Sequence, residues 1–200
     1  YDSNSYKLYL YYEGFIRTYK NHNAKLWDLY RVDKISQKDL RRERFQKTLS
    51  DFGINDFNLA EKIGEDYIDV CPRKNKLYPH AIEVLDYLKE RYELHIITNG
   101  FDKTQHIKLE HSNLKPYFNQ IITSEKTGVK KPNPLIFSHA LTLANAIKDE
   151  SVYIGDNLIV DILGCQNSGI DGVYFNPERI KHAENPKFEI ECLSKLKKIF

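Results

Sequence analysis

The pattern of apolar and polar positions changes near residue 72, and the change predicts a chain of two parts. In the first part, apolar residues recur at the three- and four-residue spacing of amphipathic helices. Three helices are expected there, over residues 6–30, 36–52 and 56–70. Pro72 and the charged residues that follow it mark the break. We therefore predict a smaller helical domain over residues 1–74 and a second domain over residues 75–200.

Local signals fix the ends of the middle helix. Ser36 is followed three residues later by Asp39, an approximate capping box in which each side chain bonds the other residue's backbone N–H. Gly53 stands where a glycine commonly ends a helix.

After the break, short apolar strands alternate with amphipathic helices. The first helix is expected from Pro79 to Arg91, with the proline at its first position. Strands are expected at residues 94–98, 120–123, 151–154 and 172–175, and helices near residues 103–112, 134–144 and 160–167. This alternation predicts an α/β fold with a doubly wound, Rossmann-like parallel sheet.

The composition limits the kinds of partner and cofactor that we expect for the protein. With 30 Lys and Arg against 28 Asp and Glu, the net charge of +2 does not favour a nucleic acid polymer. The three cysteines are far apart and lack CxxC spacing, which argues against a disulfide framework or a zinc site. No apolar run approaches the roughly 20 residues of a membrane-spanning helix, and no signal peptide is visible, so we expect a cytoplasmic protein that needs no membrane. Because the sequence has no methionine, we expect the natural N-terminus to lie outside it. The oligomeric state is left open.

Polar residues follow three of the predicted strands, at the sheet edge where ligands of α/β proteins bind. The strand at residues 94–98 ends in Thr98, Asn99 and Gly100. A hydroxyl and backbone N–H groups there could hold phosphate oxygens. A simple strand-to-helix turn explains the same three residues equally well.

A lysine pair follows the second strand. Lys131 directly precedes Pro132, which stiffens the backbone around it, and a fixed ammonium suits contact with both a carboxylate and a phosphoryl group. An ordinary pair of surface lysines at the start of a helix is as good a reading of this motif alone.

Two carboxylates flank the turn after the third strand. Asp156 follows the strand and Asp161 lies in the first turns of the next helix. Mg²⁺ binds a few carboxylate oxygens together with water and substrate phosphate, so this arrangement favours a magnesium site. The alternative is a helix cap at Asp156 and a favourable charge near the helix N-terminus at Asp161.

The ordered series Thr98, Lys131 and then Asp156 with Asp161 resembles the second, third and fourth motifs of the haloacid dehalogenase superfamily, and this match runs from about Leu77 to Phe175. A closer similarity is to the pyrimidine 5′-nucleotidase and house-cleaning phosphatase branch of this superfamily. It rests on residues 97–101 and on the stretch that runs from residues 25–27 to residues 44–45. The helical part of the chain resembles the cap domain of that branch. The superfamily's first motif, Asp-x-Asp after an apolar strand, is absent from this sequence.

The resemblance implies roles for the matching residues. The catalytic residues would be Thr98, Lys131 and Asp161; substrate would be bound by Thr98, Asn99, Gly100 and Lys131; and Mg²⁺ would be the cofactor, bound by Asp156. The cap would select the leaving group, and the candidates for that task are Trp27, Tyr30 and Arg31.

The implied function is Mg²⁺-dependent hydrolysis of small phosphorylated metabolites, above all nucleoside 5′-monophosphates, through an aspartyl-phosphate. Without the nucleophile, residues 1–200 alone are expected to be inactive. A missing first strand would also leave two unpaired strand edges and an uncovered apolar slot. Two alternatives remain: a metal-independent haloacid dehalogenase that hydrolyses a carbon–halogen bond, and a noncatalytic fragment or pseudo-enzyme.

Overall fold

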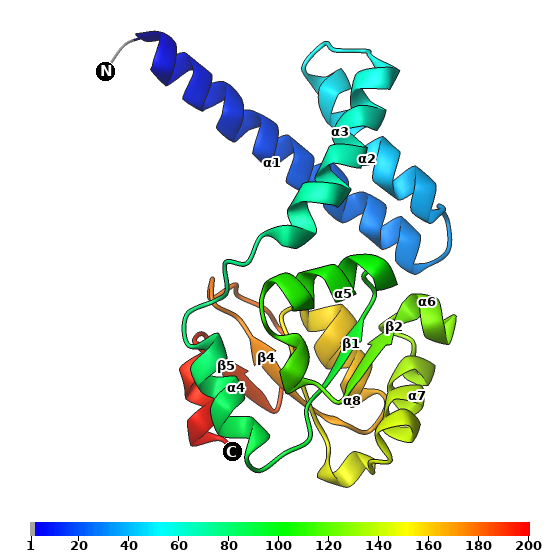
Figure 1. The fold of residues 1–200 in the computed structure, drawn as a ribbon, viewed down its shortest axis with the longest axis vertical. Coiled ribbons are helices and arrows are strands. Elements are labelled where there is room, and N and C mark those ends of the chain that lie inside the picture. The colour runs from blue at the N-terminus through cyan, green and yellow to red at the C-terminus, as the bar shows by residue number, and fades with distance from the viewer. Residues whose placement is uncertain (1–2) are drawn as a thin grey trace. The chain divides into compact units, whose positions relative to one another are not determined.

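The chain consists of two compact units, Tyr1–Cys71 and Pro72–Phe200, which are described separately. The computed structural model describes the backbone of residues 3–200 and the side chains of residues 11–200. The first unit is helical (Figure 1). Its helices are α1 (Ser3–Arg31), α2 (Gln37–Asp51) and α3 (Phe57–Val70), and a 3₁₀ turn at Cys71–Arg73 follows at the boundary of the units.

Capping explains where α2 begins and ends. The Asp39 N–H donates to Ser36 Oγ at 3.1 Å, and the Ser36 N–H donates to Asp39 Oδ2 at 3.4 Å, so the predicted capping box is formed. Gly53, just past the helix, has φ +75°, a conformation that favours glycine. The Asp56 side chain caps α3 by accepting from the Leu59 N–H at 2.9 Å. Local sequence therefore fixes these boundaries.

Apolar side chains hold the three helices together. Phe45, Leu49 and Ala60 are buried between α2 and α3, and Phe15 and Tyr19 of α1 pack against them. The rings of Tyr19 and Phe45 stack with centroids 5.1 Å apart. The unit thus has a small core of its own.

The second unit has the predicted α/β fold. Its strands are β1 (His95–Thr98), β2 (Gln120–Thr123), β3 (Val152–Gly155), β4 (Asp171–Phe175) and β5 (Phe188–Ile190). Its helices are α4 (Ala81–Lys89), α5 (Asp102–His111), α6 (Ser124–Thr127), α7 (Pro134–Ala144) and α8 (Gly164–Gln166), with a π-helix, η4 (Leu158–Leu163), before α8 and a 3₁₀ helix, η5 (Leu193–Lys198), near the C-terminus.

Several details differ from the prediction, among them the short helix α6 (Ser124–Thr127), which was not expected. The helix expected from Pro79 starts at Ala81, because His80 has φ 65° and this left-handed conformation interrupts a right-handed helix. The helix expected near residues 160–167 is divided between η4 and α8. The three-residue strand β5 is too short to show a periodic pattern and was not predicted.

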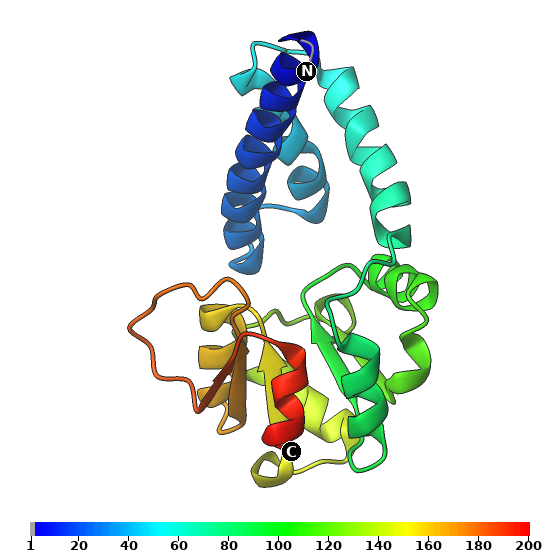
Figure 2. The ribbon, with the colours of Figure 1, turned by 90° about the vertical axis from the view of Figure 1, so that its left-hand side faces the viewer.

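The strands form two separate parallel sheets, β1-β2 and β3-β4-β5. Figure 2 shows them as two groups, green on one side and gold to orange on the other. Within residues 3–200, one edge of β1 and one edge of β3 have no neighbouring strand. The side chains of Val152 and Ile154 on β3 remain 41% and 37% exposed.

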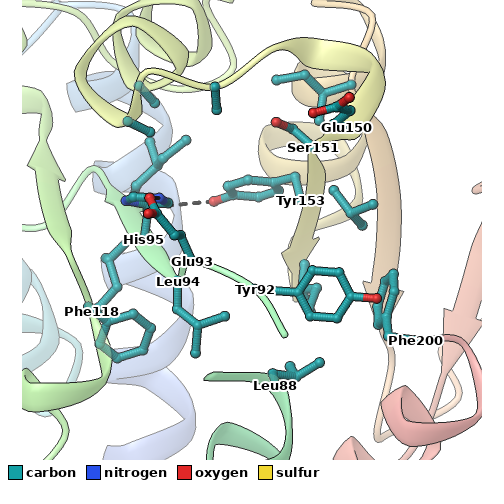
Figure 3. A pocket seen from close by; sticks show the side chains of 18 of the residues that line it. Leu88, Tyr92, Glu93, Leu94, His95, Phe118, Glu150, Ser151, Tyr153 and Phe200 are labelled. Carbon is teal, nitrogen blue, oxygen red and sulfur yellow. Dashed lines mark hydrogen bonds and ion pairs between the residues drawn. The ribbon is translucent and has the colours of Figure 1, made fainter. Parts of the chain in front are cut away.

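A cavity of about 1060 Å³, here called the slot, is lined by both free edges. Ile96 and Ile97 of β1 line it, as do Val152 and Ile154 of β3. Apolar residues of the surrounding helices complete the lining: Val84 and Leu88 of α4, Phe137, Ala140 and Leu141 of α7, and Leu196 of η5. Figure 3 shows residues that line this space, among them His95 of β1 and Tyr153 of β3.

None of the helices within residues 3–200 combines the length and apolar character needed to cross a membrane. The three cysteines are free thiols; Cys165 is buried, and Cys71 and Cys192 are partly exposed.

Replacing Ser36 with alanine should destabilise the helical unit by about 1 kcal/mol, because the N-cap oxygen is lost. Urea unfolding followed by circular dichroism would measure the change. Ser50→Ala, which removes an exposed serine hydroxyl near the end of the same helix, is the matched control and should not destabilise the unit. Equal effects of the two substitutions would contradict the capping interpretation.

Candidate active site

The structure brings Lys131 and Asp161 into contact at the carboxyl end of the sheets. Lys131 Nζ lies 2.6 Å from Asp161 Oδ1. The two residues are only 8% and 4% exposed. Buried charges are stable only when they are paired, and here each supplies the other's partner.

Both oxygens of Asp161 are engaged within the protein. Oδ1 accepts from Lys131 and lies 3.3 Å from the Tyr153 hydroxyl, while Oδ2 accepts from the Asn157 N–H at 3.1 Å. Gly155 makes this approach possible, since a Cβ there would lie 2.4 Å from the Asp161 Cβ. Asp161 therefore orients Lys131 and joins the turn after β3 to the lysine loop.

Asn99 fixes the backbone of the same lysine. Its Nδ2 donates to the Lys131 carbonyl oxygen at 2.9 Å, and its Oδ1 accepts from the Lys131 N–H at 2.8 Å. The carboxamide is thus occupied on both sides. Asn99 joins the end of β1 to the lysine loop, so the ends of β1 and β3 meet at Lys131.

Thr98 and Gly100 form a tight turn at the end of β1. The Gly100 N–H donates to Thr98 Oγ1 at 2.9 Å. This bond uses the glycine amide and an oxygen lone pair, but the threonine hydroxyl still has its own proton to donate. Of the two, Thr98 is the one equipped to donate to an anionic ligand.

Asp156 differs from Asp161 in being exposed at the tip of β3. Within the described side chains, residues 11–200, its carboxylate has no hydrogen bond or ion pair. A free carboxylate is a hard oxygen donor suited to Mg²⁺, which takes its remaining ligands from water and phosphate. Among those residues it belongs to no group of three or more acidic, histidine or cysteine side chains, so Asp156 would be a single protein ligand for such an ion.

Tyr153 belongs to this cluster, although no local pattern in the sequence singles it out. Its hydroxyl oxygen lies 2.7 Å from Lys131 Nζ. Burial, with the nearby Asp161 carboxylate, raises the pKa of Tyr153 well above its ordinary value. Tyr153 lies inside a predicted apolar strand, where an aromatic residue is most simply read as core.

The cap candidates lie in the helical unit and form local contacts there. The rings of Trp27 and Tyr30 meet edge to face with centroids 5.6 Å apart, and Arg31 pairs with Asp28 at 2.6 Å. Tyr30 is 8% exposed, so its ring is part of the packing. Their role in a ligand site stays a prediction.

Residues 10–175 match the model of a protein family described as "haloacid dehalogenase-like hydrolase". The chain belongs to this family of hydrolases. Pyrimidine 5′-nucleotidase PynA of Streptococcus pneumoniae is 33% identical to it, over 90% of this chain and 81% of the relative. A glyceraldehyde 3-phosphate phosphatase of Methanopyrus kandleri is 31% identical, over 78% of this chain and 77% of the relative.

Solved structures agree with this assignment. The HAD-hydrolase YfnB of Bacillus subtilis, described as bound to magnesium, superposes with a TM-score of 0.85 at 28% identity, over 92% of this chain and 81% of the other. A 2-haloacid dehalogenase of Pseudomonas syringae superposes with a TM-score of 0.64 at 25% identity, over 92% and 80%. The resemblance and fold class expected from the sequence are thus confirmed.

Gly155→Ala should disrupt the cluster, because the new methyl group would overlap the Asp161 side chain. We expect a destabilisation of about 1–3 kcal/mol, measured by thermal or urea unfolding. Gly14→Ala is the control: a Cβ at Gly14, in α1, would lie 3.8 Å from the Phe52 ring, an ordinary contact, and alanine favours a helix. A Gly155→Ala protein as stable as the parent would contradict the close approach.

Proposed function

We propose that the protein is a Mg²⁺-dependent phosphatase that hydrolyses small phosphomonoesters. The observation that carries the proposal is the buried Lys131–Asp161 pair with an unengaged carboxylate, Asp156, beside it at the same sheet edge. A fixed positive charge next to a free cation ligand suits the binding of a doubly charged phosphate group.

Each residue has a distinct electrostatic task in this proposal. Lys131 neutralises negative charge on the phosphoryl group and on the oxygen of the nucleophile that attacks it. Asp161 keeps the Lys131 ammonium in place. Thr98 donates its hydroxyl proton to a phosphoryl oxygen. Asp156 would hold Mg²⁺, which when bound reduces the charge repulsion between a nucleophile and the phosphate.

The nucleophile is proposed to be an aspartate on a strand that fills the slot. Free edges of β1 and β3 face the slot, and its lining is apolar on both faces, as a central strand of a parallel sheet requires. A parallel strand there would end between Thr98 of β1 and Asp156 of β3. A segment outside residues 1–200 would supply this strand, and its aspartate would form the aspartyl-phosphate.

Nucleoside 5′-monophosphates are the proposed substrates, with the helical unit as the cap that selects the leaving group. The support is the likeness to a pyrimidine 5′-nucleotidase. Relatives that act on a sugar phosphate make other small phosphate esters the next class to examine. Dehalogenation is the competing activity, since a dehalogenase shares the fold; the free carboxylate of Asp156 favours the metal-dependent reaction instead.

The activity test uses the natural protein, including any segment that precedes residue 1. Nucleoside monophosphates, sugar phosphates and p-nitrophenyl phosphate should be hydrolysed with Mg²⁺ and not with excess chelator. Asp156→Asn should abolish the Mg²⁺-dependent rate while leaving the fold intact, because a neutral amide is a poor ligand for this ion. Glu178→Gln, which neutralises an exposed carboxylate elsewhere, is the control. Chloride release from 2-chloropropionate without metal would overturn the proposal.

A second test concerns the slot. Residues 1–200 alone should be inactive, should bind a hydrophobic dye and should aggregate, because two strand edges and an apolar surface are exposed. The natural protein should melt cooperatively and bind little dye. A monomeric, cooperatively melting and active chain of residues 1–200 would show that no further strand is needed.

A further inference from the structure

We propose that Tyr153 is a positioning residue, whose hydroxyl fixes the direction in which the Lys131 ammonium points. This inference rests on the proposed function, in which that ammonium contacts the phosphoryl group. It concerns the hydroxyl alone and not the aromatic ring.

The ammonium has three N–H donors, and the protein uses two of them. One is directed to Asp161 Oδ1 at 2.6 Å and one to the Tyr153 oxygen at 2.7 Å. Among residues 11–200, whose side chains the structure describes, Lys131 Nζ has no third acceptor. Two fixed donors leave one direction for the third, so the ammonium presents one defined N–H rather than rotating freely about its carbon–nitrogen bond.

The proton of the phenol supports this arrangement. Because the Tyr153 oxygen accepts from Lys131, its own proton is donated elsewhere. Among the described residues, two acceptors lie within reach at 3.3 Å: the Ile97 carbonyl oxygen of β1 and Asp161 Oδ1. The bond to Ile97 reaches from β3 to the residue before Thr98. Tyr153 thereby connects Lys131 with the ends of both β1 and β3.

The ring is held independently of the hydroxyl. It meets Phe137 of α7 edge to face with centroids 5.3 Å apart, and its backbone pairs with Gly172 in the β3-β4 ladder. A phenylalanine would keep these contacts and remove one acceptor from the ammonium. The substitution therefore separates positioning from packing.

Tyr153→Phe in the natural protein should lower kcat for p-nitrophenyl phosphate by about 10- to 100-fold, as expected when a charged group is misplaced by a fraction of an ångström to one ångström. KM should change much less, since the substrate contacts remain. Tyr87→Phe is the matched control. It also removes one tyrosine hydroxyl, but the Tyr87 hydroxyl of α4 donates to the Phe200 carbonyl oxygen and not to a residue of the candidate site, so kcat should be unchanged. An unchanged kcat in Tyr153→Phe would overturn the proposal.

A double-mutant cycle separates positioning from a general structural effect. In a Lys131→Met background, Tyr153→Phe should lower the residual kcat no further, because no ammonium remains to be positioned. Losses that multiply in the double variant would mean that Tyr153 acts independently of Lys131, which contradicts the proposal.

A spectroscopic measurement tests the same point without relying on turnover. In ¹⁵N-lysine protein, the Lys131 ammonium should give a slowly exchanging signal, assigned by its loss in Lys131→Arg. Tyr153→Phe should weaken or remove that signal while Tyr87→Phe retains it. If the natural protein hydrolyses no phosphate ester, the proposed function fails, and this measurement still decides the positioning claim: an identical signal in Tyr153→Phe sinks it.

Discussion

The ion pair between Lys131 and Asp161 is the interaction on which the site depends. Two nearly buried opposite charges are stable together, whereas either one alone would carry a desolvation cost of several kcal/mol. The pair also joins segments that are 30 residues apart in the chain. Because Asn99 binds the backbone of the same lysine, Lys131 is bonded both to the turn after β1 and to the turn after β3.

Close backbone approaches make this pair possible. Gly155 leaves room for Asp161, and Gly164 lets α8 come near Pro132, where a Cβ would lie 3.1 Å from the proline Cα. Gly155 thus lies directly against the carboxylate of the pair, and Gly164 packs against the proline that follows Lys131. A larger side chain at either position would press on the residues around the ion pair.

The two parallel sheets, β1-β2 and β3-β4-β5, show how the site depends on the fold. Hydrogen bonds from Asn99 and Tyr153 relate β1 to the lysine loop and to β3, yet the strands themselves do not pair. The charged groups are thus already in position around an apolar slot. In our proposal, a strand in that slot would place the nucleophile beside charged groups that Asn99, Asp161 and Tyr153 hold in position, which is the form of preorganisation that favours catalysis.

The sequence by itself determined the elements and the polar residues at their ends. Periodicity located the three helices of the first unit, and capping residues such as Ser36 defined their limits, because these signals act over a few neighbouring positions. The positions of Thr98, Lys131, Asp156 and Asp161 followed from the rule that ligands bind beyond strand ends. Only the tertiary structure decided which contacts these residues make. Asp161 pairs with Lys131, the Asn99 carboxamide binds the backbone of Lys131, and the Asp156 carboxylate has no partner among the described side chains. The role of Tyr153 could not be predicted from the sequence, because its contact with Lys131 joins a strand to a distant loop, and such a contact produces no local sequence pattern.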